Sequence, residues 1–203
     1  KKGVSFAYSL FYLEENMKNI KSYLITDPNY FSNNPEKFEE KLRAVLKNHK
    51  IDFACFRDKS SQNIEELAKI FLQICKEFKI ENIFINSNIT LATKLGFDGV
   101  HLNSQQFDKI ENAKKSNLIT IISCHTLKEL ENSMKKNIDF VTYSPIFDTP
   151  NKGKAKGVEQ LNEATKNFPN LKIFALGGII KDEQIKDIEK TKAYGFASIR
   201  YFI

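Results

Sequence analysis

The stretch FACFRDKSSQNIEELAKIFLQICKEFKIENIFIN, residues 53–86, holds one complete repeat of the pattern that decides the fold. It begins with the short apolar run FACF at 53–56 and ends with a second run, IFIN, at 83–86. Between the two runs, the apolar residues recur at helical spacing. They form one stripe, which consists of Ile64, Leu67, Ala68, Phe71, Leu72 and Cys75. Two buried strands joined by an amphipathic helix are typical of a parallel sheet.

Similar apolar runs recur on both sides of this repeat. They are YLIT at 23–26, GVHL at 99–102, TIIS at 120–123, FVTY at 140–143, IFAL at 173–176 and FASI at 196–199. Together with the two runs above, they make eight predicted strands, and charged segments of helical spacing separate most of them. Eight alternations predict the α/β class and a (β/α)₈ TIM barrel, for which 203 residues is a short chain.

The two ends of the chain depart from a regular barrel. The sequence stops at SIRYFI directly after the eighth predicted strand, so we expect the barrel to lack its final helix. We assign residues 1–22 to an N-terminal extension and residues 23–203 to a single TIM-barrel domain. The segment SLFYLEENMKNI, residues 9–20, has helical spacing and is predicted to form a helix beside strand eight, where it would cover Ile199.

Composition excludes several classes of protein. A chain with 41% hydrophobic residues can bury one sizeable core, and no apolar run approaches the length of a membrane span. The N-terminal segment becomes acidic too early for a signal peptide, so we expect a soluble, cytoplasmic protein without a membrane partner. The net charge of +6 is spread along the chain as lysines, which argues against a nucleic-acid partner. The sequence leaves the oligomeric state open, a homodimer included.

The three cysteines show neither the number nor the spacing of a disulfide framework or a zinc site. Cys55, Cys75 and Cys124 are odd in number and form no CxxC pair. We therefore predict free thiols.

Residues with polar side chains, and two glycines with accessible backbone N–H groups, follow the predicted strands at their carboxyl ends, where TIM barrels build their sites. They are Arg57, Lys59, Asn86, Ser123, His125, Thr149, Lys152, Gly177, Gly178 and Arg200. The segment FVTYSPIFDTPNKGKAKG, residues 140–157, adds lysines among small residues, as expected of a loop that receives an anion. The turn LGGI after strand seven offers backbone N–H groups to a phosphate. The phase of His101 within its short strand is not decided by the sequence.

His125 is the candidate proton carrier. It precedes Thr126 and Glu129, which have the spacing of a capping box at a helix start. A helix N-terminus disfavours a protonated imidazole, so a neutral His125 could accept a proton near pH 7. The alternative is a histidine that only closes the turn between strand and helix.

In their order and spacing, several fragments resemble the thiamine phosphate synthase and TenI superfamily, from about residue 23 to residue 203. These fragments are YLITD, FRDK, IFIN, GFDGVHL, ISCHTLKELENSMKKNIDFVTYSPIFDTPNKG and IFALGGI. The resemblance implies a (β/α)₈ barrel that binds a thiazole phosphate. In the synthases it also implies a hydroxymethylpyrimidine diphosphate and magnesium.

The resemblance also assigns roles to residues. Contacts to the diphosphate or pyrimidine fall on Arg57, Lys59, Asn86 and Lys152. Ring contacts fall on Ser123 and Thr149. The cradle of the thiazole phosphate falls on Gly177, Gly178, Ile199 and Arg200.

The sequence departs from the synthase pattern at the magnesium ligands. Two aspartates of that pattern are replaced by Ser87 and Gln106, and Asp108 could substitute only if its loop shifted. The TenI branch needs no metal and moves one proton with a histidine, which matches His125. We therefore expect a TenI-like thiazole tautomerase that binds a small phosphate substrate and needs no cofactor. The alternatives are a thiamine phosphate synthase with an altered magnesium site and a non-catalytic sensor of a phosphate ligand.

Overall fold

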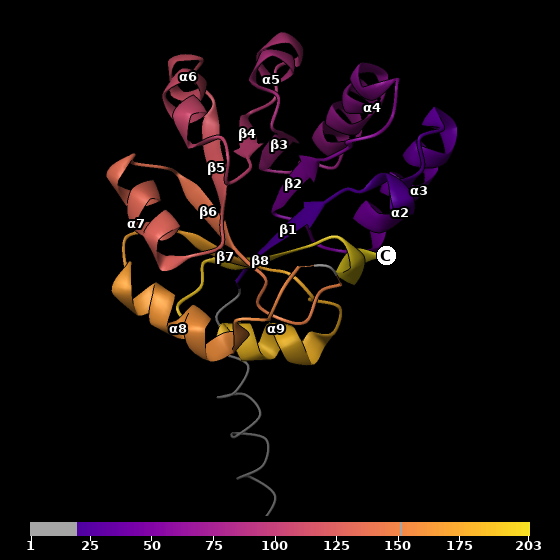
Figure 1. Cartoon of the computed structure of the whole chain (residues 1–203). Helices are drawn as coiled ribbons and strands as arrows, with labels where there is room; N and C mark the ends of the chain where they lie inside the picture. Colours follow the sequence, from indigo (N-terminus) through magenta and orange to yellow (C-terminus); the bar gives the residue numbers. More distant parts are fainter. Residues whose placement is uncertain (1–19, 151) are drawn as a thin grey trace, which may run out of the picture.

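Eight parallel strands close into a barrel in chain order, and the last strand pairs with the first. This computed structural model describes residues 20–150 and 152–203, and Figure 1 shows the helices arranged around the sheet. The strands are β1 (Lys21–Ile25), β2 (Phe53–Phe56), β3 (Asn82–Asn86), β4 (Gly99–Leu102), β5 (Ile119–Cys124), β6 (Phe140–Tyr143), β7 (Ile173–Leu176) and β8 (Gly195–Ser198). The predicted TIM barrel is confirmed: β2, β4, β6 and β7 have the predicted boundaries, and those of the other four strands differ by one or two residues.

Helices follow the strands on the outside of the sheet. They are α2 (Pro28–Phe31), α3 (Pro35–Asn48), α4 (Ile64–Glu77), α5 (Ile89–Leu95), α6 (Ile110–Lys115), α7 (Leu127–Lys135), α8 (Gly157–Asn167) and α9 (Asp182–Glu189). Two short 3₁₀ segments are η1 (Phe107–Lys109) and η2 (Arg200–Phe202). The stripe predicted on α4 does face the sheet, because Leu67, Ala68 and Phe71 are fully buried. At the start of α7, Thr126 and Glu129 form the predicted capping box.

Aromatic rings fill the interior of the barrel below the site. The Phe53 ring centroid lies 6.0 Å from that of Phe84 and 5.1 Å from that of Phe174. Glycines on the neighbouring strands make room for these rings. A Cβ on Gly99 would lie 2.5 Å from the Phe84 ring, and a Cβ on Gly195 would lie 2.6 Å from the Phe174 ring. The floor of the site is therefore a rigid, tightly packed aromatic layer.

After β8, the described residues continue as η2. Figure 1 shows η2 between α9 and α3. Tyr201 and Phe202 contact the outward-facing Phe196, with ring centroids at 5.3 Å and 5.8 Å. The ring centroid of Phe202 also lies 5.5 Å from that of His49, the residue that follows α3. These aromatic contacts cover the outer face of β8 with residues from the end of the chain.

The helix predicted for residues 9–20, and with it most of the extension assigned to residues 1–22, lies outside the described residues. One assumption behind that prediction is wrong. Ile199 packs with the residues inside the barrel and lines the cavity at its carboxyl end, so it is not an outward residue that needs a covering helix. The outward position belongs to Phe196 because side chains alternate along a strand.

Two further expectations can be compared with the described residues. None of the described helices combines the length and the apolar character needed to cross a membrane. The thiols of Cys55, Cys75 and Cys124 are all buried and free, as predicted.

Candidate active site

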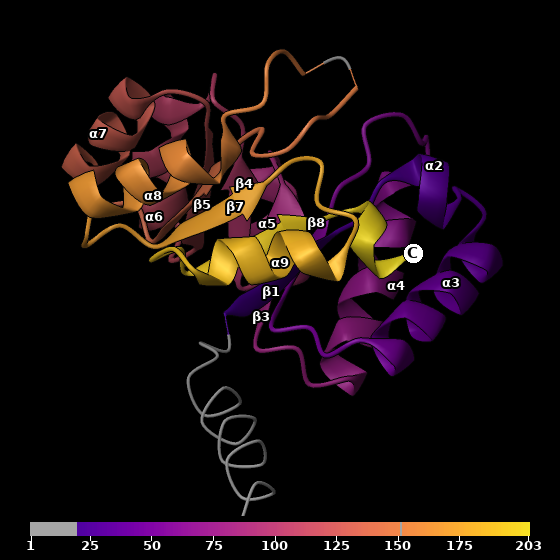
Figure 2. The same ribbon diagram turned by 90° about the horizontal axis from the view of Figure 1, so that it is seen from below.

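The carboxyl ends of the strands surround a cavity of about 470 Å³. Figure 2 shows the barrel from the side, with the loop between β6 and α8 standing out beyond the ring of helices. Every residue that the sequence analysis proposed for the site lines this cavity: Arg57, Lys59, Asn86, Ser123, His125, Thr149, Lys152, Gly177, Gly178, Ile199 and Arg200. Its volume lies within the range of small-molecule sites. The sequence-predicted residues therefore form one contiguous site in space.

Three cations gather on the side of the cavity next to β2. The pKa of Lys59 is lowered, first by the positive charge of Arg57, then by burial, and then by the charge of Lys152, while Asp27 opposes the shift. In the described part of the chain, neither Lys59 nor Lys152 forms an ion pair. A cluster of like charges without enough carboxylates is unfavourable in the free protein, and an anion would relieve it.

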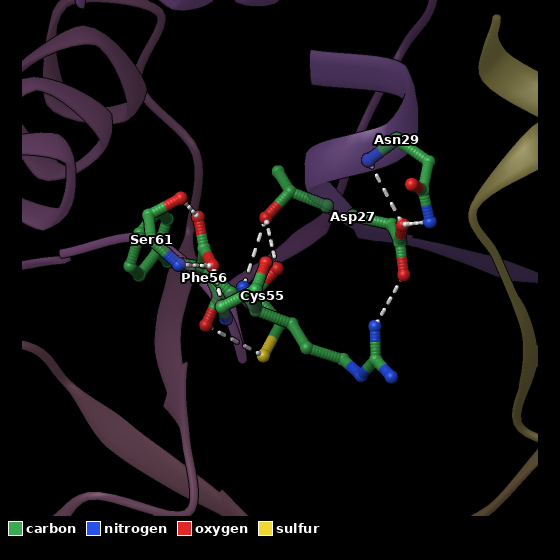
Figure 3. Close-up of polar contacts among 9 residues, drawn as sticks. Asp27, Asn29, Cys55, Phe56 and Ser61 are labelled. Atoms are coloured by element: carbon green, nitrogen blue, oxygen red, sulfur yellow. Dashed lines mark hydrogen bonds and ion pairs between the residues drawn. The ribbon is translucent and has the colours of Figure 1, made fainter. Parts of the chain in front are cut away.

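Arg57 is held in place by the end of β1. Its backbone N–H donates to Thr26 Oγ1 at 2.8 Å, and its guanidinium donates to Asp27 Oδ2 at 2.6 Å. Figure 3 shows Asp27 also accepting hydrogen bonds from the backbone and side chain of Asn29. The sequence analysis did not foresee this ion pair. Asp27 orients Arg57 and removes part of its charge from the cavity.

Of the three lysines in the loop after β6, only Lys152 lines the cavity. Lys156 lies over the Tyr143 ring, with Nζ 5.1 Å from the centroid, and Lys154 is exposed. The lysine-rich loop therefore supplies one charge to the site rather than three.

The turn after β7 forms another part of the cavity wall. Gly178 has φ +70°, and a Cβ there would lie 2.5 Å from the Asp148 backbone oxygen, so only glycine fits without strain. Among the described residues, no protein acceptor pairs with the N–H groups of Gly178 and Ile179. Arg200 lines the same cavity. Free N–H groups and a guanidinium in one cavity are suited to binding a phosphate.

His125 is exposed at the cavity rim, and its ring orientation is set by the residue after β6. Its Nδ1 lies 3.2 Å from the Ser144 carbonyl oxygen and 3.2 Å from Ser144 Oγ. A carbonyl oxygen can only accept, so this contact favours a proton on Nδ1 and leaves Nε2 as a free acceptor. His125 thus has the form that a general base requires.

His101 is a site residue that the sequence analysis did not assign. It points into the barrel, is buried, and lies on the cavity floor. Burial, followed by the charge of Arg57, lowers its pKa to about 3, so the ring is neutral. The alternation within GVHL could have placed it, because Val100 and Leu102 pack outward against the helices.

The hydroxyl and amide groups of two other predicted residues are engaged within their own loops. Thr149 Oγ1 donates to the Phe147 carbonyl at 3.0 Å, and Asn86 Nδ2 donates to Ser87 Oγ at 3.0 Å. Both side chains still border the cavity. They would have to share or exchange these hydrogen bonds to contact a ligand.

The residues at the expected magnesium positions do not fit that ion. Ser87 Oγ accepts N–H groups from both Asn86 and Asn103, and the Gln106 side chain is bound to the Ser87 carbonyl and the Asn103 N–H. Magnesium prefers carboxylate oxygens, whereas these neutral groups bind one another and direct N–H donors at Ser87. Asp108 is exposed and lies outside the cavity lining. No group of three acidic, histidine or cysteine side chains suited to a metal occurs in the described ranges.

Comparison with known proteins identifies the family. Residues 22–202 match the profile of a family described as thiamine monophosphate synthase. "Putative thiamine-phosphate synthase 2" of Aquifex aeolicus (strain VF5) is 33% identical over 186 residues, which cover 89% of this chain and 96% of that protein. "Thiamine-phosphate synthase 1" of Streptococcus pneumoniae (strain ATCC BAA-255 / R6) is 32% identical over 154 residues, covering 71% and 72%.

A solved structure agrees with these sequence relatives. The thiamine phosphate pyrophosphorylase from Pyrococcus furiosus superposes with a TM-score of 0.75 at 26% identity, covering 92% of this chain and 87% of that one. Fold and cavity together define a (β/α)₈-barrel protein with its site at the carboxyl ends of the strands. The chain belongs to the thiamine monophosphate synthase family. It is therefore an enzyme of that superfamily, and its relatives, which are named synthases, give no support to the sequence-based preference for an isomerase.

Proposed function

We propose that this protein is a thiamine-phosphate synthase, a transferase that joins hydroxymethylpyrimidine diphosphate to a thiazole phosphate. The observation that carries the proposal is that one cavity is lined by two sets of groups that suit an anion. The cations Arg57, Lys59 and Lys152 form the first, and the turn at Gly178 with Arg200 forms the second. A tautomerase acting on a single monophosphate needs only one such site. The names of the relatives support the same choice.

The first anion site suits the leaving diphosphate. In the proposed reaction, the bond between the pyrimidine methylene carbon and a diphosphate oxygen breaks, and the thiazole nitrogen forms a bond to that carbon. Negative charge develops on the departing pyrophosphate, and three cations at one side of the cavity stabilise it. The 2.6 Å ion pair with Asp27 holds the Arg57 guanidinium in a fixed orientation.

The second anion site anchors the other substrate. The N–H groups of Gly178 and Ile179, with Arg200, would hold the thiazole phosphate and so direct its ring toward the cavity centre. Because the residues present do not fit magnesium, the negative charge of the pyrophosphate would be neutralised by Arg57, Lys59 and Lys152. No proton transfer is needed in the bond-forming step.

The tautomerase remains a second candidate on one observation. The Ser144 carbonyl favours the Nδ1–H form of His125, which leaves Nε2 ready to accept a proton at the cavity rim. In that reaction His125 would remove a proton from a thiazole carboxylate phosphate and return it at another ring position.

A side-by-side assay tests the proposal. The protein is incubated with hydroxymethylpyrimidine diphosphate and thiazole phosphate, and thiamine phosphate and pyrophosphate are quantified together. In parallel, it is incubated with the thiazole carboxylate phosphate tautomer alone. We expect equimolar thiamine phosphate and pyrophosphate in the first assay, and retained synthesis in a His125→Gln variant. Tautomerisation that is lost in His125→Gln, without synthesis, would establish the second candidate. Tight binding with neither reaction would indicate a sensor.

A further inference from the structure

A chain of hydrogen bonds runs from the barrel interior to the cavity floor. The hydroxyl of Tyr23 lies 2.9 Å from His101 Nδ1, and His101 Nε2 lies 3.1 Å from Ser123 Oγ. Thr142 Oγ1 is more distant from Nε2, at 3.5 Å. Tyr23 on β1 is completely buried, whereas Ser123 on β5 is half-buried and lines the cavity. Of the two ends of this series of hydrogen bonds, only Ser123 borders the cavity and can contact a ligand.

The direction of these hydrogen bonds follows from the partners available to Tyr23. Its hydroxyl is buried among aromatic rings, and the other polar group near it is the Cys55 thiol. Sulfur is a weak acceptor, whereas a neutral imidazole nitrogen is a strong one. Tyr23 therefore donates to His101 Nδ1. That choice puts the ring proton on Nε2, since a neutral imidazole carries one N–H.

The same reasoning extends to Ser123. With its proton on Nε2, His101 donates to Ser123 Oγ, so the serine uses a lone pair toward the barrel interior. No other described group binds the Ser123 hydroxyl. Its O–H must then point away from His101, toward the cavity. The packing around His101 supports a single orientation, because its ring stacks on Tyr23 with centroids 5.7 Å apart.

We infer that Tyr23 and His101 are positioning residues that make Ser123 a hydrogen-bond donor to an acceptor atom, such as a ring nitrogen, of the heteroaromatic substrate. The identity of that substrate rests on the proposed function, whereas the direction of the hydrogen bonds in the free protein does not. The lowered pKa of His101, about 3 because of burial and Arg57, keeps this arrangement unchanged over the whole physiological range.

The first experiment measures the tautomer of His101 in the protein without ligand. The full chain is labelled with ¹⁵N-histidine, and long-range ¹H–¹⁵N correlation spectra are recorded between pH 5 and 9. The chain has three histidines, so His49→Gln and His125→Gln spectra assign His101 by elimination. We expect a neutral ring protonated at Nε2 at every pH. A ring protonated at Nδ1, or one that titrates near pH 6.5, would overturn the inference whatever reaction the protein catalyses.

The second experiment asks whether Tyr23 acts through Ser123. Binding of hydroxymethylpyrimidine diphosphate and of thiazole phosphate is measured for Tyr23→Phe, Ser123→Ala and the double variant, with Tyr194→Phe as the matched control at the opposite end of the barrel. We expect Ser123→Ala to weaken one ligand about tenfold, and Tyr23→Phe to weaken the same ligand about threefold, with no further loss in the double variant. Additive losses, or an equal loss for pyrophosphate alone, would indicate a merely structural role for Tyr23.

Discussion

Replacing Lys59 by glutamine tests the cation cluster of Arg57, Lys59 and Lys152, because it should weaken anion binding and stabilise the free protein. In the bound state the variant loses one charge-assisted hydrogen bond, which contributes about 1.5–3 kcal/mol where solvent is excluded. Lys59 is exposed, so screening by solvent reduces the effect to the lower end of that range. The affinity for pyrophosphate should therefore fall about tenfold.

The free protein should become more stable in the same variant. Lys59 is repelled by Arg57 and Lys152, and the lowered pKa of Lys59 reports this repulsion. Relief of two screened repulsions contributes a few tenths of a kcal/mol to about 1 kcal/mol, which raises the melting temperature by about 1–3 °C in a chain of this size. Lys154→Gln removes another exposed lysine, from the loop after β6, that does not line the cavity. This control should change neither quantity.

Calorimetric titration with pyrophosphate and thermal unfolding measure the two effects. A pH series adds a further readout. Because the pKa of Lys59 is lowered from 10.5, the cluster loses charge in the alkaline range below that value, and pyrophosphate binding should weaken as pH rises through it. Lys59→Arg, which stays protonated, should remove this part of the pH dependence. Unchanged pyrophosphate affinity in Lys59→Gln would refute the idea that the cluster is an anion site.

Three other predictions concern the barrel floor, the ion pair and the metal positions. Gly99→Ala should lower stability by about 1–3 kcal/mol in chemical denaturation, because its Cβ would lie 2.3 Å from the Ile119 carbonyl oxygen; an unchanged midpoint would show that the strands can separate there. Asp27→Asn should tighten pyrophosphate binding severalfold in titrations, since it removes a carboxylate beside the cluster, and weaker binding would make its orienting role dominant. Ser87→Asp combined with Gln106→Asp should weaken pyrophosphate binding without magnesium, and added magnesium should restore the affinity. In the parent protein, magnesium should change the pyrophosphate affinity little. A strong magnesium effect in the parent would contradict the idea that the chain's own cations neutralise the diphosphate.

The sequence predicts the barrel well because its signal is local and repeated. Each strand is a short apolar run, and segments such as α4 carry a clear stripe, so eight weak signals reinforce one another. The carboxyl ends of parallel strands meet at one face, which explains why residues as distant in sequence as Arg57 and Arg200 line the same cavity.

The contacts that the sequence does not reveal are those between residues on different strands. The ion pair of Asp27 with Arg57 and the hydrogen bond of Tyr23 to His101 join different strands, and neither has a local motif. The misplacement of Ile199 has a similar origin. The predicted run 196–199 extends past the end of β8, and its apolar character suits the cavity as well as the outer face.

The pairing of β1 with β8 has a consequence for folding during synthesis. Lys21 aligns with Gly195 across this ladder, so β1 can pair with β8 only after all the strands between them have been synthesised. Until then the growing sheet has two unpaired edges, which can recruit strands of other molecules. Gly178 and Arg200, which line the cavity, are also synthesised after the first seven strands. A nascent chain therefore has no complete cavity until its barrel has closed, and a ligand that spans the cavity can stabilise only the closed barrel.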